Sequence, residues 1–449
     1  MTDTDQDHPR GPHLAPFRGL RFVREHVGSL AAVTSPPYDV VVRPDGQRHL
    51  ETADPYNVVR LILPDASTPD ARHHKAARTL AAWLDQGVLA RDPAPALYVY
   101  EQRDGDHLQR GVIGALRLSG PEEGAVLPHE DVMPGPVADR AALMRATGAN
   151  LEPLLLAYRD GPATAGIVER TAATEEPLLA ITTEDGVRHR LWALTGSAEQ
   201  AAIDAELADR QALIADGHHR WATYRRLQAD HPPGTGWDYG LVLLVDSARY
   251  PLRVRAIHRV LPELPPAAAL AAARGAFRVR RLAGDDLEAA LRVLAEASGD
   301  TGAGAGAASG GTGPAAGEVA GGVEGNAFLL AGDGFHLLDR ADPVLLRETV
   351  PDDRPEPWRR LDATVLHGLL LDHVWRVPDS PEHIRYIHDA EAAVRLAGQL
   401  GGTAVLMHPV REGVVLDLAR QGVMMPRKST SFGPKPASGL VMRSVEPRR

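Results

Sequence analysis

The order of apolar and polar positions along the chain predicts a mixture of strands and amphipathic helices. Alternating or short apolar runs predict strands at residues 16–22, 57–63, 96–101, 109–118, 151–158, 213–216 and 239–246, with a hairpin over 178–194. Apolar residues spaced three and four apart predict helices at 71–86, 139–147, 198–208 and from 218 onward. Strands and helices therefore alternate irregularly, as in a mixed α/β (α+β) fold.

A second, smaller α/β portion is predicted after residue 262. Its expected helices cover 267–274, 286–297, 361–374 and 390–399, and its expected strands cover 277–282, 327–340 (a hairpin) and 403–408. Residues 298–325 are dominated by Gly, Ala, Ser and Thr, which cannot offset their own ordering entropy. We therefore divide the chain into a disordered N-terminus (1–15), a first domain (16–262) and a second domain (263–449) with a flexible insertion (298–325).

Composition and charge narrow the class of protein. With 44% hydrophobic and 24% charged residues in 449, the chain has the composition of a globular protein. It has no cysteine, which excludes disulfides, zinc–thiolate sites and thiol catalysis. A formal net charge of −10 disfavours non-specific binding to nucleic acid. No long apolar run occurs and the first residues are polar, so we expect no membrane partner and a cytoplasmic location.

The segment that runs from a short apolar strand into a helix carries the clearest chemical pattern. Apolar residues 221, 224 and 227 would bury one face of that helix. The turn before it and its first residues are Asp216, Gly217, His218, His219 and Arg220. Backbone N–H groups and the helix dipole make such a first turn an anion site, and a guanidinium suits a phosphate or a carboxylate. The alternative is an ordinary capped helix start.

Further candidate site residues lie elsewhere in the first domain. His129 and Glu130 end a strand-like run, and an imidazole beside a carboxylate suits acid–base chemistry or metal binding, although neighbours in a strand point to opposite faces. Two prolines hold a loop that presents Tyr38, a candidate substrate contact, and Asp39, a candidate general base or magnesium ligand. Asp39 could equally cap the next segment. Arg140 is a candidate phosphate or substrate contact.

The second domain contributes a basic and hydroxylated segment, Lys428-Ser429-Thr430, between two prolines. These residue types suit a phosphate, but no glycine-rich loop precedes them, so the segment is not a Walker motif, and a solvated loop is the alternative. His258 could line a site or pack in the core. The chain has only three lysines, namely Lys75, Lys428 and Lys435.

Taken in order, these segments resemble the bacterial and archaeal family known as domain of unknown function 1015. The matching segments are 16–22, 36–40, 55–60, 127–130, 139–140, 145–147, 149–151, 216–220 and 425–430. Their order and approximate spacing follow the family from end to end. The chain departs from the pattern at Val137, where a lysine is expected, and at Trp221, where tyrosine is usual. The family name implies no activity.

The segment 216–220 is also similar to the signature turn of the ParB/sulfiredoxin-like superfamily, which includes free-serine kinases. That resemblance implies a ParB/sulfiredoxin-like mixed-sheet N-terminal domain with inserted hairpins, and a turn that holds nucleotide phosphates at a helix N-terminus. Sulfiredoxin chemistry needs a cysteine in this turn, and the helical DNA-binding domain of ParB proteins is not found here. The kinase branch of the superfamily remains.

We therefore expect an enzyme, a nucleotide-dependent kinase that uses ATP or ADP with Mg²⁺ to phosphorylate a small hydroxylated metabolite such as free serine. Asp39 or Glu130 would be the base, with His129 beside it, and Lys428 would assist the 216–220 turn in binding phosphates. The alternatives are a nucleotide-binding regulatory module and a metal-dependent phosphohydrolase that uses His129, Glu130 and Asp216. The expected partners are a nucleotide and a metabolite, and homo-oligomerisation is left open.

Overall fold

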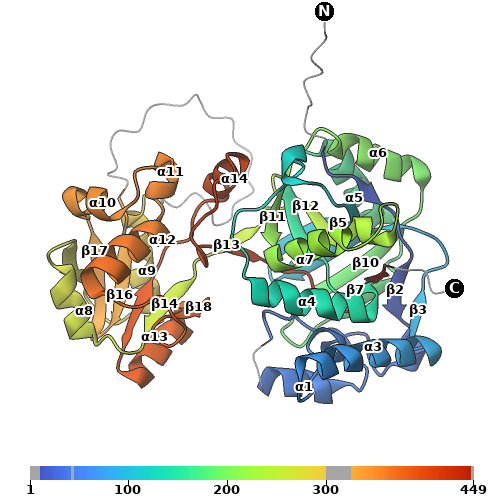
Figure 1. Ribbon diagram of the computed structural model, residues 1–449, viewed down its shortest axis with the longest axis horizontal. Helices are drawn as coiled ribbons and strands as arrows, with labels where there is room; N and C mark the ends of the chain where they lie inside the picture. The colour runs from blue at the N-terminus through green and yellow to red at the C-terminus, as the bar shows by residue number, and fades with distance from the viewer. Residues whose placement is uncertain (1–10, 42–44, 300–324, 446–449) are drawn as a thin grey trace, which may run out of the picture. The chain divides into compact units, whose positions relative to one another are not determined.

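The computed structural model describes residues 11–41, 45–299 and 325–445, which Figure 1 draws as ribbons. The chain forms two compact units, of which unit 1 contains Met1–Arg253 and Phe432–Arg449 and unit 2 contains Val254–Ser431. The chain passes from one unit to the other within the short strands β13 (Arg253–Arg255) and β20 (Ser431–Gly433). The sequence-based division at residue 262 differs mainly at the C-terminus, since residues 432–449 belong to the first unit.

Unit 1 is built on a nine-stranded mixed sheet in the order β6-β11-β8-β12-β5-β4-β10-β9, with β1 also paired to β5. β6 pairs with β11, and β8 with β12, in parallel. The strands are β1 (Leu14–Ala15), β4 (Leu97–Asp104), β5 (His107–Arg117), β6 (Val126–Leu127), β8 (Leu154–Tyr158), β9 (Leu179–Thr182), β10 (Arg188–Leu194), β11 (Ala212–Asp216) and β12 (Tyr239–Asp246). The mixed α/β class is confirmed. The hairpin expected over 178–194 is β9–β10, and the strands expected at 96–101 and 109–118 pair as the hairpin β4–β5.

A second sheet in unit 1 joins segments that are far apart in the sequence. Its order is β3-β2-β21-β7, and its strands are β2 (Gly19–Phe22), β3 (Leu89–Arg91), β7 (Ala149–Asn150) and β21 (Met442–Ser444). β21 pairs with β2 on one side and β7 on the other. This pairing is the reason why the C-terminal segment belongs to unit 1.

The helices of unit 1 surround these sheets and complete two apolar cores. They are η1 (Arg24–His26), α1 (Asp45–Ala53), α2 (Val59–Ile62), α3 (Pro69–Asp85), η2 (Pro121–Glu123), α4 (Pro134–Thr147), α5 (Pro162–Thr174), α6 (Ser197–Leu207), α7 (His218–Ala229) and η3 (Gly236–Asp238). α4 packs against both α3 and α7 (Figure 1). α7 buries Trp221, Tyr224 and Leu227 in the main core, as their spacing predicts.

Two local predictions are wrong. Residues 57–63 contain helix α2 and no strand, because the side-chain oxygen of Asn57 accepts the N–H of Val59 (2.9 Å) and starts a helical turn. The expected disorder does not extend to residue 15, because Leu14 is buried in the main core and β1 pairs with β5. The rest of that predicted disorder, residues 1–10, lies outside the described part of the chain.

Unit 2 is organised around a six-stranded antiparallel sheet in the order β15-β17-β16-β19-β14-β18. Its strands are β14 (His258–Leu261), β15 (Arg278–Arg281), β16 (Phe328–Gly332), β17 (Gly334–Asp339), β18 (Arg385–Ile387) and β19 (Thr403–Leu406). Its helices are α8 (Pro266–Ala273), α9 (Leu287–Ala297), α10 (Pro343–Thr349), α11 (Glu356–Arg359), α12 (Asp362–Val365), η4 (Leu366–Trp375), α13 (Ala390–Leu400) and α14 (Glu412–Arg420). Most of the predicted insertion 298–325 falls outside the described residues.

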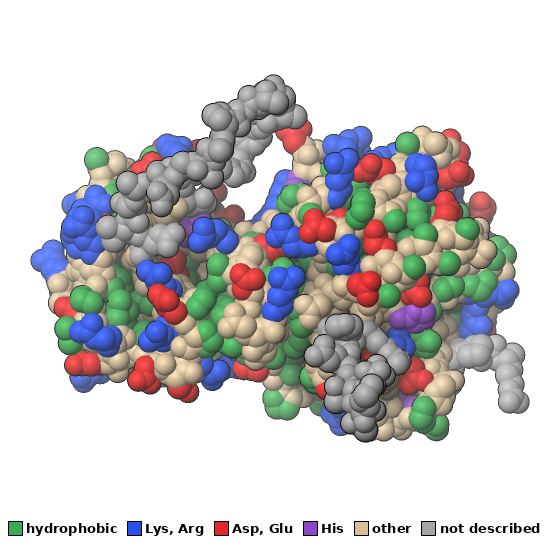
Figure 2. Space-filling view, turned by 90° about the horizontal axis from the view of Figure 1, so that it is seen from above, with side chains coloured by type: hydrophobic (Ala, Val, Ile, Leu, Met, Phe, Trp, Pro, Cys, Tyr) green, Lys and Arg blue, Asp and Glu red, His purple; other side chains and the backbone are tan. Residues whose placement is uncertain are grey.

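The surface and the helix lengths add two observations. Among the described residues, no helix combines the length and the apolar character needed to cross a bilayer. On the face shown in Figure 2, acidic and basic side chains are interspersed.

Candidate functional site

The turn between β11 and α7 lies at the carboxyl end of strand β11 in the main sheet of unit 1. β6 runs parallel to β11 and β8 runs antiparallel to it, so the residues after β6, after β11 and before β8 meet at this end of the strands. The register between β11 and β8 shifts between Ile214 and Asp216, which is a β-bulge. Ile214 faces the main core opposite Leu156, whereas Asp216 lies opposite Leu155. The bulge thus turns the Asp216 carboxylate away from the main core.

Gly217 allows the sharp turn from strand to helix. Its φ of 101° lies in the left-handed region, where a side chain would be strained. A Cβ at this position would also lie 2.5 Å from Leu154 Cδ2 and 3.2 Å from Arg220 Nε. The helix that follows has no side-chain cap, and its positive end faces the turn.

Arg220 is buried, with 2% of its surface exposed, and holds the turn from the inside. Its Nη2 donates to Asp216 Oδ2 (2.7 Å), and its Nη1 donates to the carbonyl oxygen of Pro153 (2.9 Å). Burial works to lower the pKa of Arg220, but the neighbouring carboxylates, Glu152 above all, outweigh it and raise that pKa. Arg220 therefore orients Asp216, and its burial keeps it away from a ligand that arrives from solvent.

Lys435 reaches the same turn from the C-terminal segment. Its Nζ lies 2.6 Å from Asp216 Oδ1 and also contacts Asp39 Oδ2. Burial would raise the pKa of Asp39, but Lys435 and Arg220 hold it below its ordinary value. The Asp39 side chain remains 35% exposed. An ammonium shared by two carboxylates therefore stands beside the first turn of α7.

The loop of residues 35–39 is fixed by a buried carboxyl group and by the C-terminal segment. Glu152 accepts the N–H of Tyr38 (2.9 Å) and the hydroxyl of Ser438 (3.1 Å), and burial raises its pKa. Ser35 and Ser438 exchange two backbone hydrogen bonds of 3.2 and 2.8 Å. These contacts couple the two segments that supply the exposed carboxylate and the ammonium.

Arg140, on α4, packs against the ring of Tyr38. Its guanidinium carbon lies 4.6 Å from the ring centroid, within the range of a cation–π contact. Its nitrogens donate to Asp139 (2.6 and 3.1 Å) and to the carbonyl oxygen of Ile62 (2.8 Å). Arg140 has 7% of its surface exposed, so it positions the Tyr38 ring as a buried neighbour.

The two histidines that begin α7 anchor the loop after β6. His218 Nε2 accepts the N–H of His129 (3.2 Å), and His219 Nε2 accepts the N–H of Met133 (3.1 Å). The rings of His129 and His218 meet edge to face, with centroids 4.5 Å apart. Burial lowers the pKa of His129 to about 4 and, together with neighbouring histidines, holds the pKa of His218 well below 6.5. Both rings are therefore neutral at pH 7.

A candidate metal-binding group lies in the same place. Ligand atoms of His129, Glu130 and His218 lie within 4.8 Å of one another. Neutral imidazoles and a carboxylate are suitable ligands for a transition metal. However, a neutral imidazole has one accepting nitrogen, and that of His218 already accepts the N–H of His129. A metal would have to displace this hydrogen bond, so the group fits the anchoring of the loop better than it fits a metal.

The buried histidines predict that the protein loses stability in mild acid. His129 and His189 both have a pKa lowered to about 4 by burial, so the folded protein leaves them neutral where the unfolded chain binds protons. The free energy of unfolding should therefore fall as the pH drops below about 6.5, by roughly 3 kcal/mol per histidine at pH 4.

Urea unfolding at pH 7 and pH 5 measures this loss above the range in which most carboxyl groups titrate. His189→Gln removes one of these titrating groups, so the slope of unfolding free energy against pH should fall by the contribution of about one proton. This ring lies outside the candidate site, hydrogen-bonded to Tyr100 (2.9 Å) and Thr183 (3.2 Å). Equal unfolding free energies at the two pH values would contradict the lowered pKa values of these buried histidines.

The remaining residues predicted for the site lie in unit 2, namely Lys428, Ser429, Thr430 and His258. Lys428 has a left-handed backbone (φ 57°), and its carbonyl oxygen accepts a hydrogen bond from a buried arginine (3.0 Å). His258 is buried, and its Nδ1 accepts a backbone N–H (3.2 Å). Within unit 1, the lysine at the α7 turn is Lys435.

Two residues of this arrangement were not expected from the sequence. Lys435 stands between two prolines, and its place among only three lysines was a usable signal. Glu152 precedes the apolar strand β8, and its burial among charged groups leaves no mark in the local pattern.

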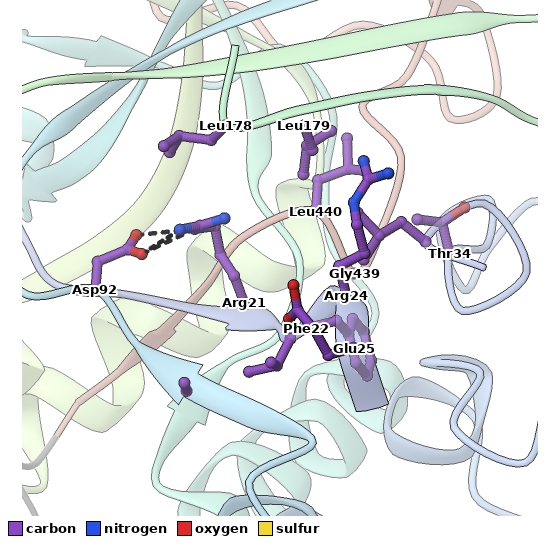
Figure 3. Close-up of a pocket in the computed structure, with 13 residues that line it drawn as sticks. Arg21, Phe22, Arg24, Glu25, Thr34, Asp92, Leu178, Leu179, Gly439 and Leu440 are labelled. Carbon is purple, nitrogen blue, oxygen red and sulfur yellow. Dashed lines mark hydrogen bonds and ion pairs between the residues drawn. The ribbon is translucent and has the colours of Figure 1, made fainter. Parts of the chain in front are cut away.

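A separate cavity of about 240 Å³ lies in unit 1 between β2, η1 and β9. Figure 3 shows Arg21 paired with Asp92 on one side and Leu178 on another. None of the residues predicted for the site lines it. Thr34 and Gly439, which do, flank the bridge between residues 35 and 438.

The comparison with protein families gives a match over most of the chain. The sequence profile of a family described as protein of unknown function (DUF1015) matches residues 14–364. The chain therefore belongs to this family, as its motifs indicated. A search among curated proteins gives no match.

Solved structures similar to this chain include three of low sequence identity. A free serine kinase in complex with AMP has 14% identity and a TM-score of 0.33, over 72% of this chain and 88% of that chain. A conserved hypothetical protein from Pyrococcus furiosus has 14% identity and a TM-score of 0.32, over 69% and 87%. SbnI with a C-terminal truncation from Staphylococcus aureus has 9% identity and a TM-score of 0.34, over 73% and 86%.

Proposed function

We propose that unit 1 is a nucleotide-dependent phosphotransferase that acts on a small hydroxylated metabolite, with free serine as the first candidate. The observation that supports it most is the meeting of Asp39, Asp216 and Lys435 at the uncapped N-terminus of α7. Carboxylates, an ammonium and a helix N-terminus are the groups that phosphoryl transfer uses to position a polyphosphate and neutralise its charge.

Each group has a role that its surroundings suit. The N-terminus of α7 and Lys435 would bind the phosphates, and the buried Arg220 would keep Asp216 in place. The oxygen ligands of Asp39 and Asp216 fit Mg²⁺, which would supply further charge neutralisation. Because Lys435 now bridges these two carboxylates, its ammonium would shift toward the phosphates when the cation binds.

Glu130 suits the role of general base better than Asp39 does. The ion pairs of Asp39 hold its pKa below the ordinary value, which makes that carboxylate a weak proton acceptor. Glu130 is half-buried on the loop that His218 and His219 anchor to α7. In the reaction, the substrate hydroxyl oxygen bonds to the terminal phosphorus, the bond to the bridging oxygen breaks, and Glu130 takes the hydroxyl proton.

The direct test is to incubate the full-length protein with ATP or ADP, Mg²⁺ and serine, and to follow phosphoserine by mass spectrometry. We expect phosphoserine to form, and Glu130→Gln to lower kcat by about 100- to 10,000-fold, as loss of a general base does. Asp39→Asn should mainly raise the Mg²⁺ concentration needed for half-maximal rate. Absence of phosphoryl transfer across a panel of nucleotides and hydroxylated metabolites would reject the proposal.

Two alternatives make different predictions in the same assay. A metal-dependent phosphohydrolase would need a metal at His129, Glu130 and His218 in place of the hydrogen bond between His129 and His218, and it would release phosphate from a simple ester and lose this activity with a chelator. A nucleotide-binding regulatory module would bind nucleotide tightly without turnover and would change its scattering profile or oligomeric state.

A further inference from the structure

A cavity of about 600 Å³ opens between helices α3 and α4 of unit 1, beside the loop that carries Asp39. On α4 it is lined by Gly135, Ala138 and Ala142, which recur at helical spacing and therefore share one face. Pro69 of α3 and Pro136 of α4 line it as well. Small side chains on this face of α4 leave space where two packed helices would otherwise interdigitate. The wall that these residues form is therefore mostly apolar.

One edge of the cavity is polar. Asp139 receives hydrogen bonds from Arg140 (2.6 and 3.1 Å) and is hydrogen-bonded to His73 (3.0 Å). Burial would raise the pKa of Asp139, but Arg140 and His73 hold it below its ordinary value, so the group stays an acceptor. Arg72, whose guanidinium lies 3.9 Å from this carboxylate, supplies donors beside it. An acceptor next to a donor matches the edge of a nucleobase, where a donor adjoins an acceptor.

The cavity adjoins the proposed phosphate site. Tyr38, which lines it, directly precedes Asp39, and its ring centroid lies 5.8 Å from the guanidinium carbon of Arg220. The first turn of α4 is tied to the first turns of α7, since Met133 N–H donates to His219 and Thr223 donates to the carbonyl oxygen of Val137 (3.3 Å). A ligand in the cavity could thus extend to the N-terminus of α7.

We propose that the α3–α4 cavity binds the base and ribose of the nucleotide, with Asp139 and Arg72 at the edge of the base. This inference rests on the proposed function, because it needs a polyphosphate at the α7 turn. With such a site, the protein would bind a nucleotide more tightly than a bare polyphosphate. The apolar wall would cover part of the base and ribose, and Tyr38 would lie between the nucleoside and the phosphate groups.

The test compares ATP with inorganic tripolyphosphate, both with Mg²⁺, by titration calorimetry on the full-length protein. Ala138→Trp fills the cavity from an exposed helical position that already points a Cβ at it. Ala202→Trp, on an exposed position of α6 that lines neither cavity, is the matched control. Gly135→Leu is a second filling variant, since an added Cβ there meets no atom within 4 Å.

We expect the wild type and Ala202→Trp to bind ATP at least about tenfold more tightly than tripolyphosphate, and both filling variants to lose this preference while their affinity for tripolyphosphate is unchanged. If ATP keeps its preference in both filling variants, or shows none in the wild type, the cavity is not the nucleoside site and the phosphate site stands. If the wild type binds neither ligand, the proposed function itself is rejected.

Discussion

Replacing Lys435 by Met should lower kcat/KM for phosphoryl transfer by about 100- to 1,000-fold, the usual cost of removing one positioned charged donor from a reacting phosphate. Nζ of Lys435 lies 2.6 Å from Asp216 and also contacts Asp39, beside the N-terminus of α7. Without it, two carboxylates that share one ammonium would repel each other and any phosphate brought near them. Steady-state kinetics with ATP and serine measure the loss.

The three lysines of the chain allow a matched comparison. Lys75→Met is the control, since this exposed side chain lies on α3 and donates to the backbone carbonyl of Asp65 (2.8 Å). Lys428→Met tests the lysine that the sequence favoured. Loss of activity in Lys428→Met with retention in Lys435→Met would reverse the assignment. Lys435→Arg keeps the charge but replaces a compact ammonium, and it should recover part of kcat while raising the Mg²⁺ concentration needed for half-maximal rate.

The local sequence predicted the turn correctly because the information is local. A buried strand, a glycine turn and an amphipathic helix can each be predicted from residues that are adjacent in the sequence. The structure has β11, Gly217 and α7 where the pattern placed them. The spacing of Trp221, Tyr224 and Leu227 likewise gave the buried face. These features follow from hydrophobic period and backbone freedom alone.

The role of Arg220 could not be predicted in this way. Its position in the first turn of a helix suggested a group that faces a ligand, yet the structure buries it against Asp216 and the carbonyl of Pro153. That outcome depends on a β-bulge between Ile214 and Asp216, which redirects the carboxylate, and on the strand β8 that lies beside β11. Bulges and strand neighbours are properties of the assembled sheet.

The sequence did not single out Lys435 for a topological reason. Lys428 and Lys435 are close in sequence, but the chain passes from unit 2 to unit 1 between them, at residues 431 and 432. What places Lys435 in unit 1 is the pairing of β21 with β2 and β7 and the bridge between residues 35 and 438. Such pairings between the two ends of a chain are set by long-range register, which a single sequence does not reveal.

Replacing Arg220 by Met should lower the free energy of unfolding by about 3–5 kcal/mol, the cost of removing one partner from a buried ion pair. The side chain is 2% exposed, and its removal takes a buried positive charge away from Glu152 and Asp216 and leaves the carbonyl of Pro153 without its donor, although Asp216 keeps its ion pair with Lys435. Arg145→Met is the matched control, because the Arg145–Asp230 pair (2.7 Å) is 48% and 45% exposed and should contribute only about 0–1 kcal/mol.

The pH dependence separates this electrostatic cause from a loss of packing. Burial already raises the pKa of Glu152, and removing Arg220, the main charge that lowers it, would raise that pKa further. A carboxyl group with a raised folded pKa stabilises below its unfolded pKa, and this contribution is lost as the pH rises through the folded pKa. The deficit of Arg220→Met in urea unfolding should therefore be larger at pH 8 than at pH 5. An equal deficit at both pH values would mean that Arg220 acts through its packing and its bond to the Pro153 carbonyl, and that the carboxylates do not need its charge.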